Sequence, residues 1–189
     1  IVRGQLRPAE KLRVQALAGR YGLAASAIRE ALSRLVTDGL VDVEDQRGFR
    51  VSPVSREDLL DLTETRVGIE SLALTRAIEL GDVDWESGIV AAFHRLSRAG
   101  GISAAAASAD HSQVSGAHHD FHRSLIAACR SEWLLYFCDV LYEQSQRYRH
   151  VALYAAPRSR NSQQEHERLM DSVIRRDVDR SCRLIGEHI

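Results

Sequence analysis

The sequence predicts a mainly α-helical protein: an N-terminal winged helix-turn-helix with a small β-hairpin as its wing, followed by an all-α helical bundle. Two observations carry this prediction. Two short helical patterns and then two short alternating runs occupy the first 54 residues, whereas only helical periodicity follows. We therefore expect two domains, residues 1–54 and residues 55–189.

The first domain has one predicted element after another with short connections. Apolar residues follow helical spacing over residues 11–21, and a second helix is expected after a tight turn, with Ser26 as its N-cap and Gly39 at its end. The alternating runs 40–44 and 49–52 then predict two strands of a hairpin. In a winged helix-turn-helix, the second helix enters the major groove of DNA.

The second domain shows six helical patterns and no strand pattern. Breaks are expected at Gly81-Asp82, Gly100-Gly101 and Ala156-Pro157. The expected helices cover residues 56–80, 84–98, 114–129, 132–152, 158–176 and 178–189. Their apolar faces are sufficient for the core of a helical bundle.

Charge is divided unevenly along the chain, although its formal net value is only −1. Residues 1–56 carry ten Lys and Arg against six Asp and Glu, whereas residues 57–189 carry fifteen against twenty. A basic N-terminal module on an acidic body is typical of a DNA-binding domain joined to a domain that does not bind DNA.

Composition places the chain among ordinary globular proteins. It has no run of eighteen apolar residues and no signal-peptide pattern, so we expect a cytoplasmic protein. The three cysteines, Cys129, Cys138 and Cys182, have no C-x-x-C spacing and lie in apolar helical patterns. We expect reduced core thiols rather than disulfides or zinc ligands.

Candidate DNA contacts lie on the second helix and on the hairpin. Arg29 and Arg34 are on the polar side of that helix, and Arg47 and Arg50 flank Gly48 in the hairpin. Arginines at such positions contact base edges or phosphates. The alternative is that they are solvated arginines of amphipathic elements, which is the commoner case.

Several motifs of the first domain occur together in register: Gly4-Gln5-Leu6-Arg7-Pro8, Leu17-Ala18, Tyr21-Gly22-Leu23, Ile28-Arg29-Glu30-Ala31-Leu32-Ser33-Arg34-Leu35, Asp38-Gly39-Leu40-Val41 and Arg47-Gly48-Phe49-Arg50-Val51. Through these motifs the domain resembles the GntR family of bacterial regulators. The resemblance implies a homodimer on palindromic double-stranded operator DNA, with Arg29 in the recognition helix and Gly48 at the wing. Where the family commonly has Ser-Arg-Thr-Pro, this chain has Ala24-Ala25-Ser26-Ala27. An expected base-contacting Arg is thus missing, and Ser26 is the candidate to replace some of its contacts.

Four histidines of the second domain are candidate metal ligands. His118 and His122 are four residues apart on one expected helix, so their imidazoles share a face, and His166 and His188 lie on two later helices. An antiparallel bundle can bring such positions together. Scattered histidines are, however, more often surface or core residues than ligands.

Similarity to the FadR-type GntR subfamily, with its C-terminal helical FCD effector domain, favours the metal. The motifs are Phe121-His122-Arg123-Ser124-Leu125, Glu165-His166 and Glu187-His188. Many members have an Asp four residues before this Phe-His pair's histidine; here His118 stands there, which implies an all-histidine site. Imidazoles favour zinc or nickel over magnesium or calcium.

A metal with open coordination positions inside a helical bundle can bind a carboxylate, so we expect a small organic acid as effector. The same resemblance implies Arg66 as a residue of its binding site. A guanidinium binds a carboxylate through two parallel hydrogen bonds. The alternative is an Arg66–Glu70 pair on a solvated helix face. Parts of the second domain are also similar to regulators of dicarboxylate (glutarate-type) catabolism.

These features predict a ligand-responsive transcription regulator, and specifically a repressor, rather than an enzyme. Clustered histidines could also activate water in a metal-dependent hydrolase, but no H-E-x-x-H, G-x-S-x-G or glycine-rich phosphate loop occurs. A further alternative is a helical domain that only dimerises and binds no metal.

Overall fold

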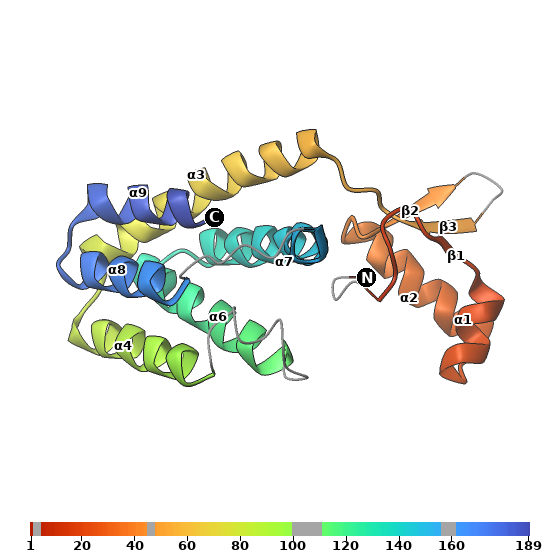
Figure 1. Cartoon of the computed structure of the whole chain (residues 1–189), viewed down its shortest axis with the longest axis horizontal. Helices are drawn as coiled ribbons and strands as arrows, with labels where there is room; N and C mark the ends of the chain where they lie inside the picture. Colours follow the sequence, from red (N-terminus) through yellow and green to blue (C-terminus); the bar gives the residue numbers. More distant parts are fainter. Residues whose placement is uncertain (2–4, 45–47, 100–110, 156–161) are drawn as a thin grey trace. The chain divides into compact units, whose positions relative to one another are not determined.

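The structure of the chain is a computed structural model that describes residues 1, 5–44, 48–99, 111–155 and 162–189. Arg47 and the predicted helix breaks at residues 100–101 and 156–157 lie outside the described residues. The predicted fold class is confirmed: a small three-stranded sheet accompanies the first two helices, and helices make up the described part that follows (Figure 1).

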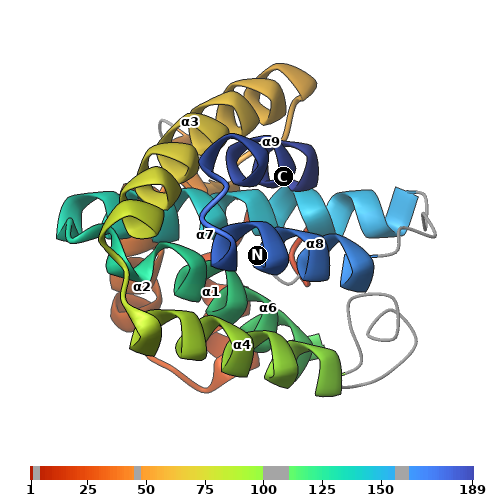
Figure 2. The same cartoon turned by 90° about the vertical axis from the view of Figure 1, so that its left-hand side faces the viewer.

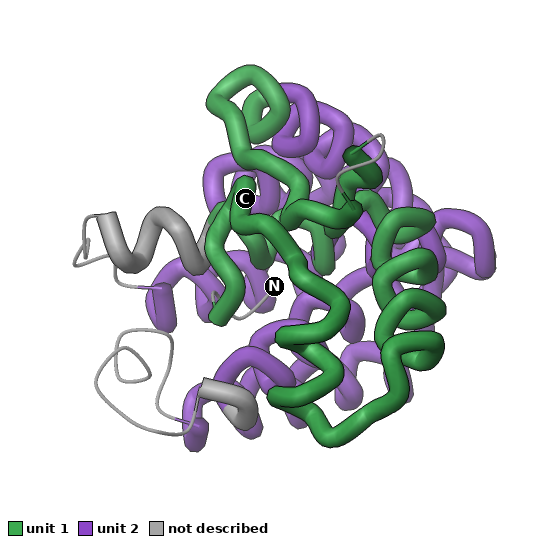
Figure 3. The backbone as a smooth tube through the Cα atoms, turned by 90° about the vertical axis from the view of Figure 1, so that its right-hand side faces the viewer, with its two compact units in different colours: residues 1–60, 143–154 green, residues 61–142, 155–189 purple. Residues whose placement is uncertain are grey.

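The chain forms two compact units (Figure 3). Unit 1 consists of residues 1–60 together with residues 143–154, and unit 2 consists of residues 61–142 together with residues 155–189. The C-terminal half of α7 (Glu132–Ala155) thus belongs to the same unit as the N-terminal module. The predicted division between residues 54 and 55 stays a prediction.

Unit 1 contains the predicted helix-turn-helix and hairpin. Its elements are β1 (Lys11–Leu12), α1 (Val14–Tyr21), α2 (Ala25–Thr37), β2 (Val41–Glu44) and β3 (Gly48–Val51). The sheet is antiparallel with the order β1-β3-β2, and Val43 of β2 faces Phe49 of β3 in the register. Gly22 ends α1 with a φ of 65°, a left-handed conformation that glycine adopts without steric cost.

Two local predictions in unit 1 were wrong. Leu12 fits the apolar spacing of the first helix, but it lies in β1, opposite Phe49, and is buried in the core. A two-residue strand is too short to show alternation, so periodicity assigned Leu12 to the helix. Ser26 does not cap α2: the N-cap is Ala24, which makes no side-chain cap hydrogen bond, and Ser26 is exposed inside the helix.

The core of unit 1 joins these elements into one small hydrophobic cluster of buried side chains. These are Leu12, Ile28, Leu32, Val41 and Val51. The predicted apolar face of α2 holds in part, because Ile28 and Leu32 are buried while Ala27 and Ala31 are exposed.

The late-helix segment of unit 1 is hydrogen-bonded to backbone carbonyls near the sheet. The buried guanidinium of Arg147 donates to the carbonyl oxygens of Ser52 at 2.6 Å, Gly39 at 3.2 Å and Pro53 at 3.3 Å. The Gln144 amide donates to the Asp38 carbonyl at 2.5 Å. Gly39, Ser52 and Pro53 lie just outside the strands, where the hydrogen bonds of the sheet end. Arg147 therefore gives their carbonyl groups a hydrogen-bond donor.

The helices of the second part match the predicted patterns to within a few residues. They are α3 (Arg56–Leu80), α4 (Val83–Arg98), α6 (His111–Ile126), the 3₁₀ turn η1 (Ala127–Cys129), α7 (Glu132–Ala155), α8 (Ser162–Ile174) and α9 (Val178–His188). Side-chain caps begin two of them: Asp82 accepts from the Trp85 amide at 2.9 Å, and Asp177 accepts from the Arg180 amide at 3.0 Å.

In unit 2, α4 packs against α6 and α8, and α8 packs against α9 (Figure 2). Phe121, Leu74, Ile89 and Leu169 are among the largest fully buried side chains of its core.

All three cysteines are free, and Cys129 and Cys138 are buried in this core. Burial raises the pKa of the Cys138 thiol to about 12, so it stays protonated. Among the described residues, no helix is both long and apolar enough to cross a membrane.

Candidate functional site

Four histidines meet inside unit 2, and they are the four that the sequence singled out. His118 and His122 come from α6, His166 from α8 and His188 from the end of α9. Their nearest ring nitrogens all lie within 4.8 Å of one another. His118, His122 and His166 are buried, and His188 is half-buried.

The spacing of the rings suits a shared ligand. The ring centroids of His118 and His122 are 4.5 Å apart, as expected one helical turn apart, and those of His166 and His188 are also 4.5 Å apart. The Nε2 atoms of His166 and His188 are 3.1 Å apart. Two nitrogens bound to one zinc at about 2.0–2.1 Å each are themselves about 3–4 Å apart.

Two further side chains orient the rings. The Nδ1 atom of His188 is 3.0 Å from Oε2 of Glu165, so a neutral His188 donates its Nδ1 proton there and keeps a lone pair at Nε2. Nδ1 of His118 lies 3.0 Å from the hydroxyl of Tyr142 on α7. Carboxylate and hydroxyl partners of this kind fix the tautomer and ring orientation of metal-binding histidines.

His122 is the least satisfied member of the cluster. Within the described part of the chain, neither of its ring nitrogens has a hydrogen-bond partner, although both are buried. Burial holds the pKa of His122 well below 6.5, and the neighbouring histidines and Arg66 lower it further. At neutral pH this imidazole is therefore uncharged and has a lone pair to offer, which is the form that binds a metal.

Arg66 and Glu70 form the pair that was the alternative to an effector-binding role for Arg66, but the pair is buried rather than on a solvated face. Nε of Arg66 donates to Oε1 of Glu70 at 2.6 Å, and both side chains are less than a tenth exposed. The guanidinium also lies 5.2 Å from the ring centroid of Tyr142, the residue that contacts His118. Burial raises the pKa of Glu70, and Arg66 opposes that rise. A buried cation is thus placed beside the histidine cluster.

The donor set fits a borderline divalent metal. Three or four neutral imidazoles suit zinc, copper or nickel, whereas calcium and magnesium prefer oxygen ligands. Both orienting partners and the unpaired nitrogens of His122 agree with such an ion. The role of the four histidines as ligands stays a prediction.

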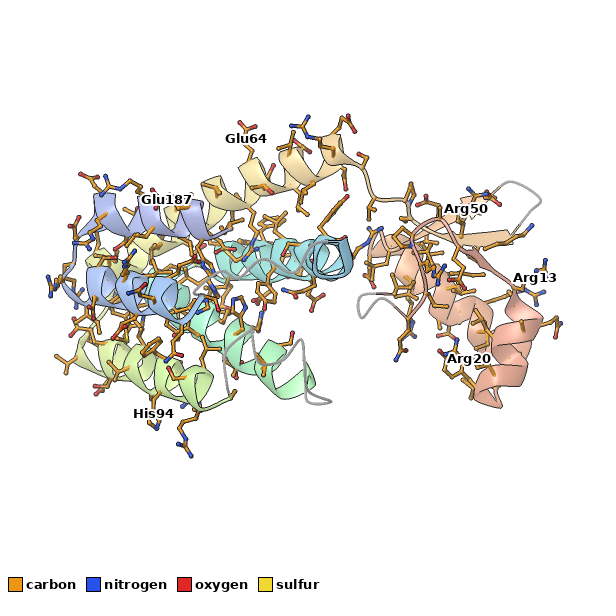
Figure 4. The ribbon with its side chains drawn as sticks, viewed as in Figure 1. Arg13, Arg20, Arg50, Glu64, His94 and Glu187 are labelled. Atoms are coloured by element: carbon orange, nitrogen blue, oxygen red, sulfur yellow. The ribbon has the colours of Figure 1, made fainter. Side chains whose placement is uncertain are left out.

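The candidate DNA contacts lie on the surface of unit 1. Arg29 is exposed on α2, while Arg34 is exposed and paired with Glu30 at 2.7 Å. Arg50 of β3 is half-buried and forms an ion pair with Glu44 across the hairpin, whereas Arg13 and Arg20 are exposed elsewhere on unit 1 (Figure 4). Gly48 opens β3 with a φ of 94°, a conformation that favours glycine. Surface ion pairs of this kind contribute little to stability, so these arginines can exchange partners for phosphates.

Comparison with known proteins decides the family. The family model "Bacterial regulatory proteins, gntR family" matches residues 1–51, and the model "FCD domain" matches residues 61–189. The HTH-type transcriptional regulator BphR of Paraburkholderia xenovorans is 38% identical over 189 residues, which cover 100% of this chain and 77% of that protein. The chain belongs to the GntR family. It is a DNA-binding transcriptional regulator with an FCD domain.

Three further proteins are similar to this chain over most of their length. The HTH-type transcriptional repressor GlaR of Escherichia coli is 34% identical over 193 residues, covering 100% of this chain and 87% of GlaR. The solved structure of E. coli McbR/YncC has a TM-score of 0.75 at 20% identity and covers 99% of this chain and 86% of that one. A GntR regulator from Rhodococcus sp. RHA1 gives the same TM-score of 0.75. Both structures support the fold.

The sequence did not predict the residues that contact the four clustered histidines of this GntR regulator. Tyr142 continues the buried spacing of Leu135 and Cys138 on α7, so its burial was readable, but its contact with His118 was not. Glu165 precedes His166 in the sequence, yet its carboxylate binds His188, 23 residues away. Contacts between helices depend on packing, which a single sequence does not show.

Proposed function

We propose that this GntR regulator is a ligand-responsive repressor whose helical unit holds a divalent metal, zinc or nickel, and a small carboxylate effector. The buried cluster of His118, His122, His166 and His188 carries the proposal. A bound ion would act as a Lewis acid that coordinates a carboxylate group of the effector. The chain's own residues would fix the ion, orient the ligands and bind the rest of the effector.

The cluster is costly without an ion. Burying a polar atom without a hydrogen-bond partner costs about 1–3 kcal/mol, and both nitrogens of His122 are in this condition among the described residues. The pairs His118–Tyr142 and His188–Glu165 would hold two of the ligand rings in place before the ion binds. Binding the ion would then cost little side-chain entropy.

Arg66 is proposed to bind the effector. Its guanidinium is buried, and its Nε atom is engaged by Glu70. Together with a metal, a second cationic group fits a ligand with two carboxylates, such as glutarate. Glu70 would hold the guanidinium in place.

The DNA target is proposed to be a palindromic operator bound by a homodimer, with Arg29 as the principal contact of α2 and with Ser26, Arg34, Arg47, Gly48 and Arg50 around it. Unit 1 supports this through the exposure of Arg29 on α2 and the position of Arg50 on β3. Repression is supported by the similarity to GlaR, which is a transcriptional repressor by name. A regulator that binds chromosomal DNA acts in the cytoplasm.

Helix α7 is the proposed route from effector to DNA. Tyr142, which contacts His118, and Arg147, which binds backbone carbonyls of unit 1, lie five residues apart on this helix. An effector that changes the setting of Tyr142 would shift the population of two arrangements of α7 and so change operator affinity.

Elemental analysis of the purified full chain tests the metal. Wild type is expected to carry about one zinc or nickel per chain, and His122→Ala to carry far less. His94→Ala, which removes an exposed histidine on α4, should keep the metal and serves as the matched control. A wild type that stays metal-free after incubation with zinc or nickel would instead support a bundle whose His166–His188 pair is a simple hydrogen bond.

Fluorescence anisotropy tests the effector, using an operator fragment that the purified protein selects from random DNA. Glutarate is expected to weaken operator binding by wild type, and Arg66→Met to abolish this response while operator binding without glutarate persists. Acetate is the comparison ligand with a single carboxylate. An Arg66→Met variant that responds to glutarate as wild type does would remove Arg66 from the proposal.

A further inference from the structure

Helix α7 exposes a row of large apolar side chains that its own unit does not cover. Trp133 is 72% exposed, Tyr136 56%, Phe137 46% and Val140 36%. Their spacing of three, one and three residues places all four on one face of the helix. The opposite face of the same segment carries Leu135 and Cys138, which are buried in the core. The N-terminal half of α7 is therefore apolar on two faces.

The aromatic side chains of this row already pack against one another. The ring centroids of Tyr136 and Phe137 are 5.4 Å apart in an edge arrangement, and the rings of Trp133 and Phe137 are stacked at 6.2 Å. A preformed aromatic cluster loses little side-chain entropy on binding. Tryptophan and tyrosine are also the residues most enriched among binding hot spots.

We propose that this row, Trp133, Tyr136, Phe137 and Val140, is the surface through which two copies of the chain pair, α7 against α7 in antiparallel orientation. The proposal rests on the homodimer proposed above and assigns the surface that forms it. A twofold axis between Tyr136 and Phe137 places Trp133 of one copy opposite Val140 of the other and Tyr136 opposite Phe137. The row is thus self-complementary, as an interface between identical copies must be.

Charge agrees with this register. Arg130 is exposed two residues before α7 begins, where its backbone is left-handed with a φ of 53°, and Glu143 is exposed on α7 three residues after Val140. The same twofold axis brings Arg130 of one copy opposite Glu143 of the other. Opposite charges at the rim fix register and disfavour alternative pairings.

The exposed area is of the right size. With about 150–250 Å² for each large aromatic side chain, the three aromatic residues expose roughly 350 Å² per copy. A standard interface buries about 800 Å² per partner, with a polar rim around an apolar centre. The row therefore supplies the apolar centre, and the flanking charges belong to the rim.

Sedimentation equilibrium of the full chain tests the surface. Wild type is expected to be a dimer, and Tyr136→Arg, which places like charges beside each other at the axis, is expected to raise the dimer dissociation constant at least about tenfold. Val90→Arg, at an apolar side chain of α4 that is 47% exposed, is the matched control and should dimerise as wild type does. Circular dichroism melts show whether each variant is folded.

A charge exchange tests the register without adding a charge to the apolar centre. Arg130→Glu and Glu143→Arg should each weaken the dimer, and the double variant should recover most of the wild-type affinity. A monomeric wild type would overturn the homodimer itself. A wild-type dimer that Tyr136→Arg leaves unchanged, or single charge variants that the double variant does not rescue, would overturn this surface and leave the proposed homodimer and metal site standing.

Discussion

Replacing His122 with leucine separates the cost of the empty histidine cluster from the benefit of a metal. Leucine is close in size to histidine and has no polar atom to satisfy, so His122→Leu removes two buried nitrogens that lack partners in the described structure. At about 1–3 kcal/mol for an unsatisfied buried polar group, the metal-free variant should be more stable than metal-free wild type by about 2 kcal/mol. For a chain of this size that corresponds to about 4–8 °C in melting temperature.

The order should reverse when metal is present. A ligand at 100 times its dissociation constant stabilises the native state by about 2.7 kcal/mol, and only wild type should gain this. Thermal melts by circular dichroism, with excess chelator and then with zinc, measure both orders in one experiment. His94→Leu, on the exposed surface of α4, is the control and should melt like wild type in both conditions.

The reasoning would be refuted by metal-free His122→Leu melting several degrees below metal-free wild type. That result would mean that His122 makes favourable polar interactions in the metal-free protein. Its unpaired nitrogens would then not indicate a missing ligand.

Four further outcomes are expected. Because the pKa of His122 is lowered in the folded protein, the metal-free state should lose stability as the pH falls below 6.5, and the urea midpoint of His122→Leu should fall less over the same range. Arg147→Met leaves three backbone carbonyls of unit 1 without their donor and should cost about 2–4 kcal/mol of unfolding free energy in urea titrations; a loss under 1 kcal/mol would contradict this. His118→Asp should still bind one ion per chain but gain affinity for manganese relative to nickel, as competition titrations would show. Arg29→Ala should weaken operator binding by about 1–3 kcal/mol in anisotropy titrations, whereas Arg183→Ala on α9 should not; equal effects would remove Arg29 as the principal contact.

The sequence predicted the order of elements well because their signals are local. The amphipathic pattern of α2, the glycine that ends α1 and the alternation of β2 and β3 are each readable within a few residues. β1 was missed for the same reason: two residues show no period, and only pairing with β3 makes them a strand. The N-cap of α2 was misplaced because Ser26 has a typical capping side chain, while the helix begins one residue before it without such a cap.

The histidine cluster was predictable in its members but not in its setting. Four-residue spacing gave His118 and His122 a common face, and the resemblance to FadR-type regulators linked them with His166 and His188. No local pattern shows that Glu165 contacts His188. Spacing also could not show that Arg66 and Glu70 are buried as a pair. A four-residue spacing of opposite charges is common on exposed helix faces as well.

The hydrogen bonds of Arg147 bear on how such regulators can be recombined. A fragment that comprises only the predicted first domain, residues 1–54, would lack the guanidinium that donates to the carbonyls of Gly39, Ser52 and Pro53. A chimera that joins this head to an unrelated helical domain would inherit the same unsatisfied groups unless the new partner offers an equivalent donor. The DNA-binding domain is therefore not self-sufficient in hydrogen bonding. A functional chimera should keep a cationic side chain at the position of Arg147.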